Sequence, residues 1–165
     1  MATHGLRGYD SCLLRKEADV SEQNKSVVRR IVEEHWNNKN AGLVEELFAS
    51  NVSLETPDGV LTGLDGASSL LQAYATAFPD FRLIIDDLLA DGDRVVLRWT
   101  FTGTHRGPLA DIAASGRQVR VPRGIAIFRI ATGKVEQGYF AWDKYALLQQ
   151  LGVLPMTSDT SARVS

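Results

Sequence analysis

The sequence has few of the residues that build disulfide or metal frameworks. It contains a single cysteine, Cys12, and three histidines. One thiol can form neither an intramolecular disulfide nor a zinc cluster, which favours a reducing compartment and predicts a cytoplasmic protein. The sequence also lacks an apolar run of about 18 residues, so no membrane span is expected. Its first residues do not show the basic-then-apolar order of a secretory signal.

Neither sign of charge is in large excess. Lys and Arg number 18 against 20 Asp and Glu, which gives a formal net charge of −2. This balance gives no electrostatic reason to expect a nucleic-acid partner. The histidines follow no metal-ligand spacing, and there is no phosphate-binding glycine loop, dinucleotide fingerprint or G-x-S-x-G elbow. Any chemistry is therefore expected to be proton transfer without a metal or cofactor.

What the sequence does contain is enough apolar material for one core. Apolar residues make up 44% of the 165 residues and charged residues 23%, as in soluble globular domains. Residues 1–20 show no apolar period and are expected to form a flexible arm. Residues 21–153 are expected to fold as one domain, and the Ser/Thr-rich residues 154–165 to form a flexible tail.

The predicted helices come before most of the predicted strands. Apolar residues at helical spacing predict a first helix with Ser21 as its N-cap, followed by helices over 43–48 and 66–77. Alternation of apolar and polar residues then predicts long strands over 81–90, 94–105, 117–130 and 134–142. A closing helix is predicted over 145–151. This order predicts an α+β fold, in which a cone-shaped, curved antiparallel sheet wraps around the long N-terminal helix. A small-molecule pocket is expected at the open end of the cone.

Four segments of the sequence resemble a known family. They are VVRRIVEEHWNNKNAGLVEELF, AFPDFRLIIDDLLADGDRVVLRWTFTGTHRGPL, GRQVRVPRGIAIFRI and GKVEQGYFAWDKYALLQQLG. Together, from about Lys25 to Gly152, they are similar to the SnoaL-like polyketide cyclase (ester cyclase) family of the nuclear transport factor 2-like superfamily. The resemblance implies an α+β barrel and a cofactor-independent enzyme acting on a small, largely apolar carbonyl compound. Because the superfamily also contains isomerases, epoxide hydrolases, dehydratases and members without known catalysis, the reaction stays open.

Asp143 is the leading catalytic candidate. In the resembled family an aspartate at the matching position is the general acid/base of an intramolecular aldol closure. Strand alternation places Asp143 at the end of the face that carries Gln137 and Tyr139. Burial beside apolar walls would raise its pKa toward neutrality and suit it to move a C–H proton. The alternative, compatible with the first, is that Asp143 caps the last helix.

Three other charged or titratable residues could join it. His105 ends a predicted strand and could act as an acid or hydrogen-bond donor, or lie partly in solvent in a turn. Glu55 stands where the family often has His-Asp-Pro, and is a second pocket acid or a solvated charge. Arg123 shares an apolar strand face and could pair with a carboxylate or bind a substrate oxygen, or else extend to the rim. Gln137 is expected to polarise a substrate oxygen.

Aromatic residues could form a flat slot for a polycyclic substrate, although core packing is the alternative for each. The candidates for this substrate-binding slot are Trp36, Tyr74, Phe78, Trp99 and Tyr139. His35 is interpreted as a core or surface histidine rather than a catalytic one.

Three functions remain open. The first is a cyclase with Asp143 as acid/base, assisted by His105, Arg123 and Gln137. The second is epoxide opening or isomerisation, with Asp143, Arg123 and Glu55 supplying the charges. The third is a non-catalytic ligand-binding module, which an exposed Asp143 would favour. Apolar residues at both odd and even positions of 117–130 predict that a second copy covers the outer sheet face, giving a homodimer.

Overall fold

The first helix is longer than the sequence pattern predicts. The computed structural model describes residues 7–155, with side chains described from residue 16, and begins with α1 (Arg7–Arg30), which continues as the π-helical η1 (Ile31–Asn37). Residues 7–20, expected as part of a flexible arm, are thus helical, and Ser21 lies inside the helix rather than at its N-cap. Residues 16–20 are exposed, so no apolar stripe reveals the helix there, because apolar periodicity reports burial rather than helicity. Residues 1–6 and 156–165 of the predicted arm and tail lie outside the described residues.

The fold is α+β, with a curved sheet that is mixed rather than purely antiparallel. After η2 (Ala41–Leu43) and α2 (Val44–Leu47), the chain forms a hairpin of β1 (Phe48–Thr56) and β2 (Gly59–Thr62), then α3 (Gly63–Ala77). The long meander follows, comprising β3 (Arg82–Asp91), β4 (Arg94–Thr104), β5 (Gln118–Ala131) and β6 (Lys134–Ala141), before α4 (Lys144–Leu151).

The strand order is β2-β1-β6-β5-β4-β3, and β1 runs parallel to β6. This parallel pair corrects the antiparallel prediction, because alternation within a strand does not identify its neighbour. Since the outer strands β2 and β3 are not paired with each other, the sheet stays open instead of closing into a barrel. No helix of the described residues is long and apolar enough to cross a membrane.

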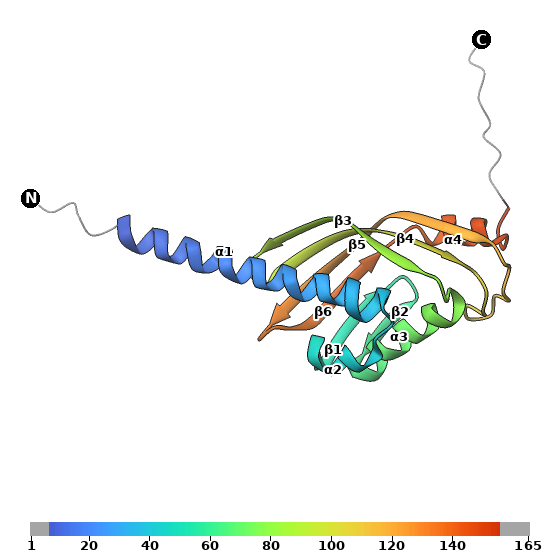
Figure 1. Ribbon diagram of the computed structural model, residues 1–165, viewed down its shortest axis with the longest axis horizontal. Helices are drawn as coiled ribbons and strands as arrows, with labels where there is room; N and C mark the ends of the chain where they lie inside the picture. Colours follow the sequence, from blue (N-terminus) through green and yellow to red (C-terminus); the bar gives the residue numbers. More distant parts are fainter. Residues whose placement is uncertain (1–6, 156–165) are drawn as a thin grey trace, which may run out of the picture.

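The C-terminal part of α1 and η1 pack against the sheet, while the N-terminal turns of α1 project beyond it (Figure 1). Val28, Ile31 and Val32 bury their side chains in this contact. The Asn37 side chain pairs with edge strand β3 as a strand would: its amide donates to the Leu83 carbonyl at 2.9 Å and its oxygen accepts from the Leu83 N–H at 2.8 Å. These bonds fix the helix against the concave face and so define the space between them.

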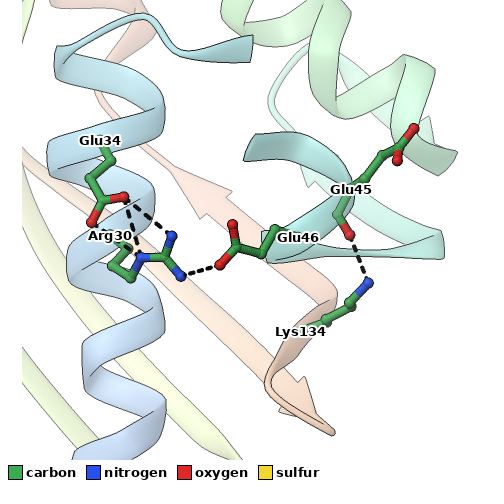
Figure 2. Close-up of polar contacts among 5 residues, drawn as sticks. All are labelled: Arg30, Glu34, Glu45, Glu46 and Lys134. Carbon is green, nitrogen blue, oxygen red and sulfur yellow. Dashed lines mark hydrogen bonds and ion pairs between the residues drawn. The ribbon is translucent and has the colours of Figure 1, made fainter. Parts of the chain in front are cut away.

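A polar cluster connects the same helix to α2, and α2 to β6 (Figure 2). Arg30 donates to Glu34 at 3.1 Å and to Glu46 of α2 at 2.6 Å, while Lys134 donates to the Glu45 carbonyl at 2.7 Å. The hydrogen bond from Arg30 lowers the pKa of Glu46, and the two carboxylates raise the pKa of Arg30. Because exposed pairs contribute little to stability, we interpret the cluster as setting the position of α2 rather than as a reactive site.

Bulges change which side of a strand faces the core. In β5, Val119 and Val121 are buried before the irregularity at Pro122 and Arg123, and Ala126, Phe128 and Ile130 are buried after it. The inward positions therefore pass from odd to even within one strand. This change explains much of why β5 has apolar residues at both odd and even positions, the pattern from which the sequence predicts burial of both sheet faces. Of the four apolar odd positions, Val119, Val121, Ile125 and Ile127, the last two lie on the outer face.

Candidate functional site

The concave face of the sheet, η1, α3 and α4 enclose an apolar cavity. The cavity is partly open to solvent. The cavity is lined by Ile31, Val32, Trp36, Leu70, Tyr74, Leu83, Leu97, Trp99, Phe101, Val121, Phe128, Phe140, Trp142 and Leu147. None of these side chains carries a charge. The side-chain polar groups of the lining are therefore one phenol and three indole N–H groups.

All three tryptophans of the chain belong to this lining. Trp99 and Trp142 lie with ring centroids 6.2 Å apart, and Trp36 lies 6.0 Å from Tyr74. Large aromatic faces present wide apolar contact area with little rotational freedom, so they suit a flat ligand. Trp36, Tyr74 and Trp99, which the sequence predicts as a slot, do line the cavity, and their contact with substrate stays a prediction.

Tyr74 provides the only hydroxyl of the cavity lining. Burial raises the pKa of its phenol, and the negative charge of Asp58 raises it further. The hydroxyl is therefore protonated at neutral pH. It has no hydrogen-bond partner among the residues that the structure describes, which leaves its proton available to a ligand oxygen.

Asp143 lies outside this lining. It is the exposed N-cap of α4, where its Oδ1 accepts a hydrogen bond from the Ala146 N–H at 2.8 Å. The capping alternative is thus observed, whereas the burial expected for an acid/base residue is not. Its neighbour Trp142 does line the cavity, and Lys144 on its other side pairs with Asp58.

Three predicted pocket residues lie on the outer face instead. The register of β5 and β6 shifts between the pairs that contain Val135 and Gln137. After this bulge Phe140 and Trp142 face the cavity, so Gln137 and Tyr139 face outward, and Tyr139 is 43% exposed. Glu55 is exposed and pairs in register with Tyr139 on the same outer face. Gln137 and Tyr139 were predicted to face the pocket because the face of the strand that ends in Asp143 was taken as the pocket face.

Arg123 is also outside the cavity. It lies in the β5 bulge with a φ of 64° and an exposed side chain. A positive φ at a residue with a side chain is uncommon and marks the bulge itself. The residue therefore leaves the inward row formed by Val119 and Val121, and does not place a charge among the lining residues.

His105 is fully buried, but it does not line the cavity. Its Nδ1 accepts a hydrogen bond from the Ser115 N–H at 3.1 Å, which assigns the proton of the neutral ring to Nε2. Nε2 is buried without a partner among the described residues, and burial lowers the pKa of the ring. His105 packs 5.1 Å from the ring of Phe78, which is itself fully buried behind the lining. Both residues are therefore core, contrary to the predicted pocket roles.

His35 is a core residue, as the sequence predicts. It is buried, its Nδ1 lies 2.9 Å from the Asn40 carbonyl oxygen, and burial lowers its pKa. Sequence reasoning missed Phe101, Phe140 and Trp142 as lining residues. The sequence places Phe140 and Trp142 on one face of the strand, but the opposite face ends in Asp143 and is therefore the one predicted to line the pocket.

Comparison with known proteins identifies the family and supports the fold. A family model described as SnoaL-like polyketide cyclase matches residues 26–151. A search of curated proteins finds no match to this sequence. Among solved structures, TsrD from Streptomyces laurentii is 28% identical, with a TM-score of 0.73 over 81% of this chain and 97% of its own.

Two further structures are similar. A protein from Jannaschia sp. CCS1 assigned as a SnoaL-like polyketide cyclase is 22% identical, with a TM-score of 0.76, covering 82% of this chain and 96% of its own. AclR from Streptomyces galilaeus, assigned as a hydroxylase, is 25% identical, with a TM-score of 0.74, covering 84% and 87%. The family match spans most of the chain, and the fold of these structures is the one described above. The chain belongs to the SnoaL-like polyketide cyclase family.

Proposed function

We propose that the cavity binds a small, flat, uncharged carbonyl compound, such as a polyketide intermediate, and promotes its intramolecular aldol closure without a cofactor. The observation that carries this proposal is a cavity lined by three indoles and one free phenol, with no charged side chain. Burying a charged ligand there would leave its charge without a partner, which is strongly unfavourable. Cofactor independence and a cytoplasmic location stay predictions.

Tyr74 is the proposed stabiliser of negative charge. In the closure, a C–H next to one carbonyl loses its proton and the resulting enolate carbon attacks a second carbonyl. The new C–C bond leaves an alkoxide, which takes up a proton, so no oxidant or reductant is needed. A phenol held in a largely apolar site stabilises the enolate oxygen more than it stabilises the ground-state carbonyl, because the charge develops only during the reaction.

Asp143 is the proposed proton acceptor, since the lining contains no base. Support comes from its position beside Trp142 and from the family resemblance. In the competing function, a binding module without catalysis, Asp143 would only cap α4, as its exposure favours. The epoxide-opening hypothesis is not retained, because Glu55 and Arg123 lie outside the cavity and the charge pattern that it needs is not assembled.

Two substitutions of Asp143 separate these roles. Asn keeps a side-chain oxygen that can cap the helix, whereas Ala removes it and is expected to lower the free energy of unfolding by about 1 kcal/mol. The probe is the neutral naphthyl ketone prodan, and the measurement is deuterium exchange of its α-protons by NMR. We expect Asp143→Asn to keep wild-type stability and lose about 10²–10⁴-fold in exchange rate. Wild-type exchange in that variant would show that Asp143 is only a cap.

A second copy is proposed to cover the outer sheet face. Leu89, Val96, Ile127 and Tyr139 form one register row across β3, β4, β5 and β6. Leu89 is 61% exposed and Tyr139 43%, and Ile125 beside this row is 42% exposed, so the row presents apolar surface to solvent. A group of adjacent, exposed apolar side chains often marks a protein–protein interface.

The homodimer is tested by sedimentation equilibrium. We expect a wild-type dimer and a monomeric Tyr139→Lys variant, because the substitution places a charge in the apolar row. Tyr145→Lys is the matched control, since Tyr145 is 52% exposed on α4, away from this row, and should stay dimeric. A monomeric wild-type protein would contradict the proposed interface.

A further inference from the structure

One glycine of β5 leaves room for an aromatic side chain that lines the cavity. Gly124 is the register partner of Trp99 on β4 and is buried. A Cβ atom at position 124 would lie 2.3–2.5 Å from the indole carbons Cε2, Cζ2 and Cδ2 of Trp99. Non-bonded carbon atoms pack at about 3.5–4.0 Å, so the indole lies where a side chain at position 124 would have to be. Glycine is needed here for space, because the backbone of Gly124 is not in the left-handed region.

The surrounding strand geometry keeps the indole in this place. The β4–β5 register shifts immediately after Trp99, and Arg123 next to Gly124 has a positive φ. Bulges of this kind re-aim side chains. Trp99 is only 9% exposed, and its ring lies 6.2 Å from that of Trp142, so the β5 backbone, Trp142 and the cavity surround it.

A side chain at position 124 would therefore move Trp99 into the cavity. The ring would have to shift by about 1 Å or more to reach van der Waals distance from a new Cβ. Trp99 lines the cavity, so a shift away from the β5 backbone takes volume from the ligand site. The lost volume would matter most for a wide, fused-ring ligand.

We propose that Gly124 is a specificity-determining position, which sets the width of the cavity by letting Trp99 lie over the β5 backbone. The ligand class that depends on this width is a fused-ring aromatic ketone, whereas a single-ring ketone does not need it. The inference rests on the proposed function, that the cavity binds flat carbonyl compounds. Gly124 itself acts as a positioning residue through Trp99.

The experiment compares the affinities of prodan, which has two fused rings, and acetophenone, which has one. Prodan is followed by its fluorescence, and acetophenone by competition with it. We expect Gly124→Ala to weaken prodan binding about tenfold while acetophenone changes by less than about twofold. The double variant Gly124→Ala/Trp99→Phe is expected to restore prodan binding, because the smaller ring leaves room for the new methyl group.

Gly103→Ala is the matched control. A Cβ at position 103 would lie 3.2–3.3 Å from atoms of Phe78 and Phe81, neither of which lines the cavity. It crowds the core without touching Trp99, so the ratio of the two affinities should stay at the wild-type value. The far-UV circular dichroism couplet of the Trp99–Trp142 pair gives a second readout, which should change in Gly124→Ala and not in Gly103→Ala.

The outcomes separate the two proposals. An unchanged couplet and an unchanged affinity ratio in Gly124→Ala would overturn the role of Gly124 while leaving the proposed function intact. Wild-type protein that binds neither ketone would contradict the proposed function, and the selectivity with it. If Gly124→Ala does not fold, Trp99→Phe alone should raise the affinity for prodan relative to acetophenone, and an unchanged ratio there would overturn the inference.

Discussion

Replacing Phe78 by alanine is expected to lower the free energy of unfolding by about 3–5 kcal/mol, with a much smaller effect on ligand affinity. Phe78 is fully buried, and its ring lies 5.2 Å from Phe101 and 5.1 Å from His105. Truncation removes these contacts and leaves a hole behind the cavity wall rather than in the cavity. Urea denaturation measures the first effect, and prodan titration of the folded variant measures the second.

Tyr145→Ala is the control for this prediction. It removes an aromatic ring that is 52% exposed, so its effect on stability should stay within about 0.5 kcal/mol. If Phe78→Ala instead kept wild-type stability and lost prodan affinity, Phe78 would belong to the ligand site, as the sequence had suggested.

Replacing Tyr74 by phenylalanine is expected to slow α-proton exchange of bound prodan by about 10²–10³-fold, as removal of an oxyanion-stabilising donor does in other enzymes. The ring stays in place, so affinity should change little, and the loss should appear in the rate of the bound ketone. NMR exchange rates at saturating protein measure it. Tyr145→Phe, which removes an exposed hydroxyl, should leave the rate unchanged.

The pH dependence of α-proton exchange tests whether the Tyr74 phenol acts in its protonated form. Burial and the charge of Asp58 raise the pKa of its phenol, so it stays protonated across the neutral range and past the ordinary tyrosine value of about 10. Deprotonation of Tyr74 should therefore cause no loss of wild-type rate between neutral pH and that value. Wild-type exchange by Tyr74→Phe would remove the phenol from the mechanism.

The fold was predictable from the sequence because its elements carry local signals. The long strands β3 to β6 alternate in hydropathy and are separated by turn residues such as Asp91-Gly92-Asp93. The parallel pairing of β1 with β6 was not predictable in this way, since no local pattern reports which distant strand is a neighbour. The helical residues 7–20 were missed because helix that is not packed on the sheet needs no apolar stripe.

The site was predicted less well, because the choice of strand face and a bulge both misled the sequence-based prediction. The face that ends in Asp143 was taken as the pocket face, which put Gln137 and Tyr139 into the pocket, whereas Phe140 and Trp142 on the opposite face line the cavity. The bulge in β5 removes Arg123 from the inward row of that strand. A bulge depends on register with the neighbouring strand, which a single strand sequence does not contain. Trp36 and Trp99 were easier to predict as lining residues, because such large rings are usually buried.

An indole NMR titration tests the central claim, that the ligand site is the cavity lined by the three tryptophans, most directly. The protein has three tryptophans, Trp36, Trp99 and Trp142, so its ¹⁵N spectrum should contain three indole signals, each from the cavity lining. On addition of prodan we expect all three to shift together with one saturation curve. Unshifted indole signals, with changes confined to the backbone signals of Gln137 and Tyr139, would place the ligand on the outer sheet face and contradict the account.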